Sequence, residues 1–357
     1  MKSSQKPISL YIHWPYCLSK CPYCDFFSQV CSQIDEALLW NGYKRDVRKW
    51  LSNRPIGTIF FGGGTPSLMS VSFMDKLLNE ISKRTTFSQN CEITLEANPD
   101  AIDKKKMKAF RNLGVNRLSL GVQSLNDSDL HFLGRRHSVE TALKRIVEAQ
   151  SIFDRINIDL IYARPNQSPQ SWEQELKQAL ALNLSHYSLY QLTIEENTLF
   201  GKKGIPSASE ENAVFLYQLT DQIMTNADTP AYEVSNYAKP GQECRHNLAY
   251  WLGQDYIGIG PAAHGRIGLL ATQNPRSIAD WLQKGTSTET LTPKQKTIER
   301  LLMGLRLRYH WFPVEGLDDN VLQKLSAKGF IERTIWGIRP TLEGTLLLDS
   351  VIAALIP

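Results

Sequence analysis

The fold class of this chain is decided by the stretch Tyr11-Ile12-His13-Trp14-Pro15-Tyr16-Cys17-Leu18-Ser19-Lys20-Cys21-Pro22-Tyr23-Cys24-Asp25-Phe26. It places three cysteines at C-x-x-x-C-x-x-C spacing directly after a short apolar run, Ile8 to Ile12. Thiolates are soft ligands that favour iron–sulfur clusters, zinc and copper(I). A four-iron cluster usually takes one cysteine per iron, so three nearby thiolates leave one iron without a protein ligand. Such an open metal position can bind and activate a small molecule.

The same cysteines fit three other kinds of site less well. Cys21-Pro22-Tyr23-Cys24 by itself is a glutaredoxin-type dithiol motif, but that function leaves Cys17 unexplained and needs a small thioredoxin-like domain. A covalent c-type haem site needs a histidine directly after Cys24, where this chain has Asp25. A structural zinc site needs a fourth ligand, and Cys31 keeps that alternative open.

Length and composition bound the class of protein. The 357 residues suggest about two domains, and a hydrophobic fraction of 42% with 21% charged residues is ordinary for a soluble globular protein. The net charge of +4 is too small to indicate binding to nucleic acid or to an anionic membrane surface. No stretch is apolar and long enough to span a bilayer, and the basic start does not resemble a secretory signal. Six cysteines in so long a chain are no disulfide framework, so we expect a cytoplasmic protein with reduced thiols.

Short apolar runs alternate with amphipathic segments in the first 230 residues. The predicted strands are Ile8–His13, Thr58–Phe61, Glu92–Glu96, Arg117–Leu120, Asn157–Ile161 and Tyr187–Leu192. The predicted helices lie near 36–52, 71–84, 103–113, 127–151 and 169–183, with a longer one at 208–226. This alternation predicts an α/β fold of parallel βαβ units, either a doubly wound sheet or an incomplete barrel. In both architectures a cofactor lies at the carboxyl ends of the strands, and the cysteines follow the first strand.

The pattern changes after residue 230. Residues 231–290 are rich in aromatic residues, glycine and proline and show weak periodicity, so we predict a connecting segment. Residues 291–357 predict a small separate, helix-rich domain with a wing: helices at 292–309 and 319–328, strand-like pieces around Ile331 and Ile338, and a final helix from Thr341.

A second motif is the glycine run Phe60-Phe61-Gly62-Gly63-Gly64-Thr65-Pro66. Glycines after a strand let the backbone approach a ligand closely and adopt unusual dihedral angles. The run differs from the G-x-G-x-x-G motif, so it does not predict a dinucleotide. By itself it predicts a tight turn before a helix. Because the three cysteines follow the preceding strand, we favour the interpretation that the glycine run contacts a ligand.

Several motifs occur in an order that is typical of one known family. Tyr-Ile-His-x-Pro-x-Cys-x-x-x-Cys-x-x-Cys-Asp-Phe, Gly-Gly-Gly-Thr-Pro-Ser, Glu-Ala-Asn-Pro and Gly-Val-Gln-Ser resemble the radical S-adenosylmethionine (SAM) superfamily. Within it they are similar to the family of oxygen-independent coproporphyrinogen III oxidases (HemN) and haem chaperones (HemW). The tail Trp311-Phe312-Pro313-Val314-Glu315-Gly316-Leu317 resembles the C-terminal domain of that family. The resemblance implies an open (β/α)6 radical-SAM barrel over residues 1–230.

The resemblance also implies a [4Fe–4S] cluster whose open iron binds SAM. The cluster ligands that carry over are Cys17, Cys21 and Cys24. The SAM pocket that carries over consists of Tyr11, Tyr23, Gly63, Gly64, Thr65, Glu96, Gln123, Arg135 and Asp159. Burying an unpaired carboxylate is costly, so Glu96 and Asp159 are expected to meet ribose hydroxyls, and the Arg135 guanidinium the SAM carboxylate. An ion pair between Asp159 and Arg135 is the structural alternative.

Two features separate the branches of this family. The cysteine motif of the oxidases is similar to C-x-x-x-C-x-x-C-x-C, with a fourth cysteine two residues after the third. This chain has Phe26 at that position. The haem chaperones carry the motif H-N-x-x-Y-W, and this chain resembles them in having that motif at residues 246–251. Both features favour a haem chaperone. One departure is Tyr162-Ala163-Arg164-Pro165, where the family usually has Tyr-Gly-Leu-Pro, and it adds a cation near the expected pocket.

The H-N-x-x-Y-W segment suits haem by its chemistry. Histidine is a common axial ligand of haem iron, and Tyr250 and Trp251 offer flat surfaces for a porphyrin face. The predicted haem-contacting residues are His246, Asn247, Tyr250 and Trp251, with Arg245 or Lys239 for the propionates. Cys244 is a second candidate axial ligand. Without the resemblance, a core histidine packed on aromatic rings is the better interpretation.

The function that the resemblance implies is a haem chaperone, which binds haem as cargo and delivers it to a haem-requiring respiratory protein. The alternative is an oxygen-independent coproporphyrinogen III oxidase, and a dithiol oxidoreductase comes last. Coproporphyrinogen III oxidase activity is not expected, and whether SAM is cleaved stays open. Peripheral association with the inner membrane and a homodimer are further expectations, and binding of nucleic acid is not expected.

Overall fold

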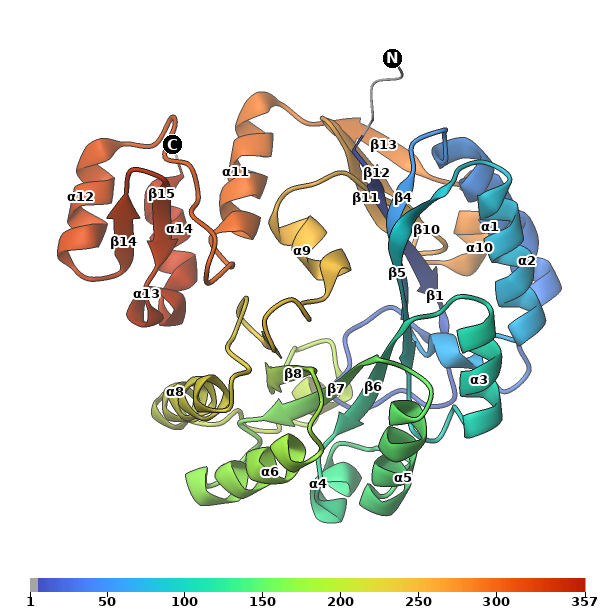
Figure 1. The fold of residues 1–357 in the computed structure, drawn as a ribbon, viewed down its shortest axis with the longest axis horizontal. Coiled ribbons are helices and arrows are strands. Elements are labelled where there is room, and N and C mark those ends of the chain that lie inside the picture. The colour runs from blue at the N-terminus through green and yellow to red at the C-terminus, as the bar shows by residue number, and fades with distance from the viewer. Residues whose placement is uncertain (1–5, 357) are drawn as a thin grey trace.

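Six parallel strands form the wall of the molecule in the computed structural model, which describes residues 6–356. They are β1 (Ile8–Trp14), β4 (Ile56–Gly63), β5 (Phe87–Ala97), β6 (Arg117–Gln123), β7 (Arg155–Tyr162) and β8 (His186–Gln191). Each pairs in parallel with the next. The helices α1 (Glu36–Trp50), α2 (Val71–Ser82), α3 (Lys104–Asn112), α5 (Val139–Gln150) and α6 (Pro169–Ala181) connect them and cover the outer face (Figure 1). The predicted open (β/α)6 barrel is confirmed.

The two faces of the barrel wall differ in polarity. On β4, Ile59 and Phe61 are fully buried and belong to the main apolar core together with residues of the covering helices. On the inner face of the neighbouring strands lie buried polar side chains, among them Thr94, Ser119 and Asn157. Because successive side chains of a strand point to opposite faces, the outward set builds the core and the inward set leaves a polar interior for a site.

The helices begin where short polar side chains cap them. Ser70, Asp103, Ser138 and Ser168 each accept a hydrogen bond from the third backbone N–H of the helix that follows, which satisfies a donor without an intrahelical partner. The single helix predicted near 127–151 is wrong. The chain forms α4 (Asp127–Phe132) and α5, and Gly134 with φ of 67° lies between them. Glycine adopts such a dihedral angle at little cost, so the chain can turn there.

Residues 231–290 add strands to both edges of the barrel wall. The strands are β9 (Asn236–Ala238), β10 (Tyr256–Ile259), β11 (His264–Ile267), β12 (Leu270–Gln273) and β13 (Ser287–Thr290). β9 pairs antiparallel with β8, β10 pairs in parallel with β1, and the other three extend that edge. The described sheet thus has eleven strands. The added strands span at most four residues, too few to leave a clear periodicity in the sequence.

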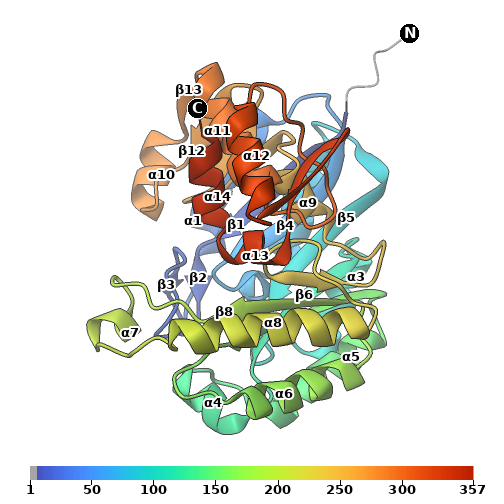
Figure 2. The ribbon, with the colours of Figure 1, turned by 90° about the vertical axis from the view of Figure 1, so that its left-hand side faces the viewer.

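The C-terminal residues form a second, smaller apolar core. It is built from the end of α11 (Pro293–Gly304), α12 (Asp319–Ala327), the hairpin β14 (Ile331–Thr334) and β15 (Gly337–Pro340), and the helices α13 (Leu342–Leu346) and α14 (Leu348–Leu355). Figure 2 shows this unit above α8 (Glu210–Asn226). The hairpin is the predicted wing, and the two strand-like pieces around Ile331 and Ile338 are its strands.

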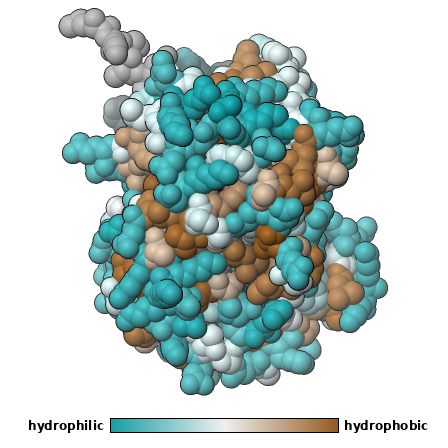
Figure 3. All heavy atoms as spheres, turned by 90° about the vertical axis from the view of Figure 1, so that its right-hand side faces the viewer, coloured by the Kyte–Doolittle hydropathy of each residue, from teal (hydrophilic) through white to brown (hydrophobic). Residues whose placement is uncertain are grey.

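The outer face of the helical layer is mainly hydrophilic, with hydrophobic patches across its middle (Figure 3). Such a surface is expected where amphipathic helices turn one stripe toward a sheet and the other toward water. Among residues 6–356 no helix combines the length and the apolar character that crossing a bilayer requires.

Candidate cluster and cofactor site

A cavity of about 430 Å³ opens at the carboxyl ends of the barrel strands. Its lining includes all three predicted cluster cysteines and eight of the nine predicted SAM-pocket residues. These are Cys17, Cys21, Cys24, Tyr23, Gly63, Gly64, Thr65, Glu96, Gln123, Arg135 and Asp159. The ninth, Tyr11, is not part of the lining. Its hydroxyl lies 3.1 Å from Nδ1 of His13, and its ring stacks on Phe60. The tertiary structure therefore gathers side chains that are spread over 143 positions, Cys17 to Asp159, around one hollow.

The three cysteines lie half-buried on the loop that follows β1. Cys17 belongs to β2 (Tyr16–Cys17), which pairs in parallel with β3 (Gln29–Val30). Cys31 directly follows β3, and its thiol donates to the Gln33 carbonyl at 3.0 Å. Burial raises the pKa of the Cys24 thiol to about 11 in the protein without metal. Binding of a metal by Cys24 therefore has to release a proton.

A cluster and a zinc site differ in how their ligands are arranged. In the described chain, no three Cys, His, Asp or Glu side chains converge on one point, as the ligands of a single metal ion do. A structural zinc site needs that convergence because all its ligands bind the same ion. A [4Fe–4S] cluster does not, because each thiolate binds a different iron. The arrangement of the three cysteines is compatible with a cluster.

The glycine run forms one wall of the cavity. Gly63 has φ of 110°, where other L residues are strained. A Cβ on Gly64 would lie 2.6 Å from the Tyr16 carbonyl oxygen and 3.1 Å from Sγ of Cys17. The absence of both side chains lets the end of β4 pass directly against the cysteine loop.

Two carboxyl groups, Glu96 and Asp159, line the cavity without an ion-pair partner among the described residues, although the buried Arg117 is close enough to lower the pKa of both. Burial, and then the nearby Asp159, raise the pKa of Glu96 to about 8. Burial also raises the pKa of Asp159, whose Oδ1 accepts from Asn157 at 2.7 Å and from Ser119 at 3.4 Å. The alternative of an ion pair between Asp159 and Arg135 is therefore wrong. Both carboxyls keep oxygens that can accept hydrogen bonds from a ligand.

Arg135 reaches the cavity from the loop between α4 and α5. Its Nη2 donates to Asn98 at 2.6 Å and to the Gly121 carbonyl at 2.8 Å, and its Nη1 donates to Sγ of Cys21 at 3.2 Å. Its Nε has no partner among the described residues. Asn98 was not among the predicted site residues, although it belongs to the Glu-Ala-Asn-Pro motif that supported the resemblance. Its position directly after a strand was the signal for it.

The cation expected from the Ala163-Arg164 departure does not lie in the cavity. The Arg164 guanidinium is 3% exposed and pairs with Glu175 at 2.7 Å and with Asp129 at 3.0 Å. It also donates to the Ile161 carbonyl at 2.7 Å. Ala163 takes the conformation that suits the usual glycine, with φ of 54°. The departure therefore leaves the charge of the cavity unchanged.

The H-N-x-x-Y-W segment forms α9 (Arg245–Trp251) at the opposite end of the barrel (Figure 1). Nδ1 of His246 lies 2.7 Å from the hydroxyl of Thr58. Thr58 lies five residues before Gly63 on β4, which corresponds to roughly 16 Å along the strand. The predicted haem-contacting residues and the predicted cluster ligands thus face different ends of the barrel interior.

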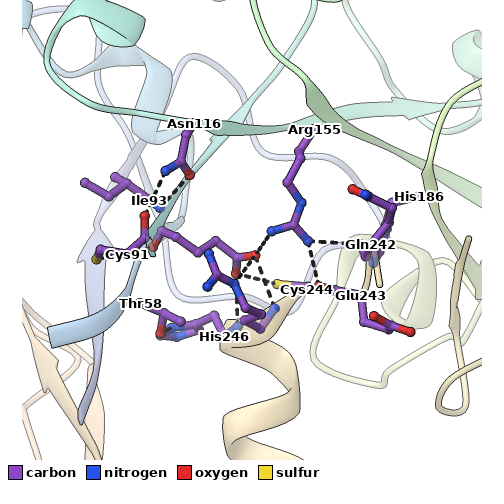
Figure 4. A network of polar contacts seen from close by, with 12 residues as sticks. Thr58, Cys91, Ile93, Asn116, Arg155, His186, Gln242, Glu243, Cys244 and His246 are labelled. Atoms are coloured by element: carbon purple, nitrogen blue, oxygen red, sulfur yellow. Dashed lines mark hydrogen bonds and ion pairs between the residues drawn. The ribbon is translucent and has the colours of Figure 1, made fainter. Parts of the chain in front are cut away.

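Glu92 holds the start of α9 through a polar network, in which Figure 4 labels Arg155, Cys244 and His246. The Glu92 residue lies on β5. Its carboxylate is fully buried, receives Arg155 Nη1 at 2.6 Å, and accepts from the backbone N–H groups of Arg245 at 3.2 Å and His246 at 3.1 Å. Arg155 also donates to the carbonyls of Gln242 and Glu243. Burial by itself raises the pKa of Glu92, but Arg117 and Arg155 outweigh it, and the pKa lies below its usual value. We call Glu92 and Arg155 the α9 clasp.

The His246 side chain is 1% exposed, and both of its ring nitrogens have partners. Besides the contact with Thr58, Nε2 lies 2.8 Å from the Tyr250 hydroxyl, and the ring stacks on Phe60. Burial lowers the pKa of His246 to about 3, so the ring is neutral. An iron bond at either nitrogen requires one of these hydrogen bonds to break. The haem contact predicted for α9 stays a prediction.

Two further residues of the predicted haem site, Cys244 and Lys239, also have hydrogen-bond partners. The Cys244 thiol is fully buried and donates to Glu92 at 3.6 Å. Lys239 donates to Asn183 at 2.9 Å. Asn247 and Trp251 are half-buried. The indole N–H of Trp251 has no partner among the described residues.

Comparison with known proteins decides the family. The family profile described as "Radical SAM superfamily" matches residues 11–179. The chain is 41% identical to "Heme chaperone HemW" of Buchnera aphidicola subsp. Acyrthosiphon pisum over 336 residues, 89% of each chain. It is 36% identical to "Heme chaperone HemW" of Escherichia coli over 369 residues, 97% of each chain. The chain belongs to the HemN/HemW family of radical SAM proteins.

A solved member of the HemN/HemW family shares the whole fold. Coproporphyrinogen III oxidase (HemN) from Escherichia coli superposes with a TM-score of 0.84. The match covers 99% of this chain and 91% of that chain at 23% sequence identity. At this identity the likeness shows the fold alone. The barrel and the C-terminal unit therefore belong to one architecture that recurs in the family.

Membership in the radical SAM superfamily implies SAM and a [4Fe–4S] cluster. The residues of the cavity fit both groups. Three thiolates supply the soft ligands of a cluster, and among the described residues the cavity beside them brings a guanidinium N–H without a partner and two carboxyls without an ion pair. These polar groups suit a ligand with a carboxylate and hydroxyls, such as SAM.

Proposed function

We propose that this chain is a haem chaperone of the HemW type, which binds haem and passes it to a haem-requiring respiratory protein. The observation that carries the proposal is the identity of 41% over 89% of both chains with a protein named for that function. Phe26 supports it, because this 68% exposed ring stands at the cavity where the oxidases carry a further cysteine. The haem-accepting protein would be encountered at the inner membrane. A homodimer of this chain stays a prediction.

In this proposal Cys17, Cys21 and Cys24 hold the cluster, and the cavity holds SAM. When bound, the cluster would supply an open iron for the amino and carboxylate groups of SAM. The side chains and backbone of the protein would determine where SAM binds beside the cluster. The bare backbone at Gly64 gives room beside Cys17, the free N–H of Arg135 can take the carboxylate, and the carboxyls of Glu96 and Asp159 can accept from the ribose hydroxyls.

The haem is proposed to bind at α9, with His246 as its axial ligand. Nε2 of His246 is the nitrogen whose present partner, the Tyr250 hydroxyl, is itself on α9 and only half-buried. A rotation of Tyr250 frees that nitrogen without disturbing the contact with Thr58. Asn247, Tyr250 and Trp251 lie on the same helix and would contact the porphyrin.

The function is tested with protein whose cluster has been reconstituted without oxygen. We expect a haem titration to give a saturable Soret band, and incubation with SAM, a reductant and coproporphyrinogen III to give no product. Cys31→Ala is the control for cluster content, because Cys31 is outside the proposed ligand set. Formation of harderoporphyrinogen or protoporphyrinogen by the wild-type protein would contradict the proposal and indicate the oxidase.

The axial ligand is tested in the same titration with two variants. Tyr250→Phe keeps the ring but frees Nε2 of His246, so it should preserve the Soret band. His246→Ala should shift that band because an axial nitrogen is lost. An unchanged spectrum in His246→Ala, together with a changed spectrum in Cys244→Ala, would move the ligand to Cys244.

A further inference from the structure

A continuous line of hydrogen bonds connects Arg135 with two of the proposed cluster cysteines. Arg135 Nη2 donates to Oδ1 of Asn98 at 2.6 Å, and Nδ2 of Asn98 donates to Oγ1 of Thr65 at 3.1 Å. The Thr65 hydroxyl in turn donates to Sγ of Cys17 at 3.4 Å. The other arm of the guanidinium donates directly to Sγ of Cys21 at 3.2 Å. We call Arg135, Asn98 and Thr65 the sulfur relay.

All bonds of the sulfur relay run in one direction, from the cation to sulfur. The guanidinium keeps its charge at every pH that proteins tolerate, so the relay has a permanent donor at its head. Hydrogen bonds in such a chain polarise one another and strengthen the last donor. One arginine therefore acts on two sulfurs, on Cys21 directly and on Cys17 through two neutral groups.

Close packing holds the relay in register with the cysteine loop. Gly134 directly precedes Arg135, and a Cβ there would lie 2.5 Å from Cδ of Pro22, which directly follows Cys21. A Cβ on Gly121 would lie 2.9 Å from Oδ1 of Asn98 and 3.4 Å from Nη2 of Arg135. Thr65 is buried behind the glycine run. The head of the relay and the cysteine loop are therefore packed directly against each other, and a side chain at Gly134 would push them apart.

We propose that the sulfur relay raises the reduction potential of the bound cluster by donating hydrogen bonds to Cys17 and Cys21. A hydrogen bond to a coordinating sulfur draws electron density from it. This favours the reduced cluster, which carries one more negative charge, and hydrogen bonds to sulfur are among the factors that set cluster potentials. Arg135, Asn98 and Thr65 are thus positioning residues for the cluster, a role separate from contact with SAM. The inference rests on the proposed cluster ligands and does not depend on haem.

The test is the midpoint potential of the reconstituted cluster in the absence of SAM, followed by electron paramagnetic resonance. Arg135→Met removes the head of the relay and should make the potential more negative than in the wild type. Arg135→Lys keeps the charge with fewer hydrogen-bond donors. Its midpoint potential should lie between those of the wild type and Arg135→Met. Arg136→Met is the matched control, because this neighbouring arginine pairs with Asp100 and has no contact with sulfur. Its potential should equal that of the wild type.

Thr65→Val provides a second, smaller change that leaves Arg135 in place. It removes the donor to Cys17 and should also lower the potential, and an exchangeable proton coupled to the reduced cluster should disappear from the spectrum. Iron content is measured in every variant, so that loss of the cluster is distinguished from a change in its potential. Should Arg135→Met fail to hold iron, Thr65→Val decides. A wild-type potential in an iron-replete Arg135→Met or Thr65→Val protein would overturn the inference.

Discussion

Glu96 and Asp159 are the two residues whose charge depends most on whether the cavity is occupied. Neither carboxyl has an ion-pair partner among the described residues; burial raises the pKa of both, and the nearby Asp159 raises the pKa of Glu96 further. A buried carboxyl without a cation is cheaper to keep neutral. We therefore expect the empty cavity to hold a protonated Glu96 near neutral pH, and a ligand that donates hydrogen bonds to favour the charged form.

The raised pKa of Glu96 predicts a pH dependence of stability. The pKa is about 8 in the folded chain and 4.5 when unperturbed. Between these values the folded state binds more protons, so stability falls as the pH rises from 4.5 and through 8. Glu96→Gln removes this loss, and its melting temperature should exceed that of the wild type more at pH 9 than at pH 6 in protein without cluster.

Glu80→Gln is the matched control for that measurement. Glu80 is also buried, but a hydrogen bond from Arg48 at 2.9 Å lowers its pKa. Both states of the chain carry the Glu80 charge from pH 6 to 9, so the difference from wild type should not change over this range. An equal difference at both pH values for Glu96→Gln would contradict the assignment of a raised pKa.

The element with the most unusual support is α9. It has seven residues, too few for a stable isolated helix. Its first backbone N–H groups are satisfied by the α9 clasp rather than by a capping side chain of its own, since Cys244 at the N-cap makes no such bond. The helix therefore depends on a carboxylate of β5 and an arginine of β7, and its stability is a property of the barrel interior.

Breaking the α9 clasp should destabilise the protein strongly. Arg155→Met leaves the fully buried Glu92 carboxylate without its closest cation, and removing one partner of a buried pair costs about 3 kcal/mol. The measurement is the free energy of unfolding in urea. Lys177→Met is the control, because this lysine pairs with Glu173 on the surface and should change stability little. Equal effects of the two substitutions would show that the clasp is not stabilising.

At the scale of the whole molecule, α1 is tied to the last third of the chain. Asp46 on α1 is fully buried and accepts from the backbone N–H of Gly260 at 3.1 Å. It also accepts from Asn274 at 3.0 Å and from the indole of Trp281 at 2.8 Å. Trp281 belongs to α10 (Ile278–Lys284) and lies in the main core. The segment 231–290 is therefore packed into the barrel by a carboxylate near the N-terminus.

Gly42 makes this packing sterically feasible. A Cβ there would overlap the ring of the fully buried Trp281. Gly42→Ala gains about 1 kcal/mol in helix propensity, yet overpacking a core costs about 1–3 kcal/mol. We expect a lower melting temperature. Asn41→Ala, at an exposed position of the same helix, should leave it unchanged or raise it. A stabilised Gly42→Ala would contradict the described contact of α1 with α10.

The sequence by itself determined the alternation of strands and helices, and its resemblance to a known family selected the barrel and predicted eleven residues that line the cavity. The six strands were recognisable because their outward faces are apolar and each is followed by an amphipathic helix, which is local information. The ends of parallel strands meet at one edge of a sheet, so polar residues such as Glu96 and Asp159 could be assigned to one site before any contact was known. The same reasoning missed the break at Gly134, because one glycine is tolerated within a helical pattern.

Only the tertiary structure decided what each polar group contacts. The two partners of His246, the α9 clasp and the sulfur relay join residues that are up to 188 positions apart, the distance in sequence from Thr58 to His246. Nothing in local periodicity specifies such pairs. The direction of the Arg164 side chain is another example, since the sequence predicts a cation and only packing against Glu175 turns it away from the cavity. Partners of buried charges are selected by desolvation and geometry in the folded chain, and these are properties of the assembled interior.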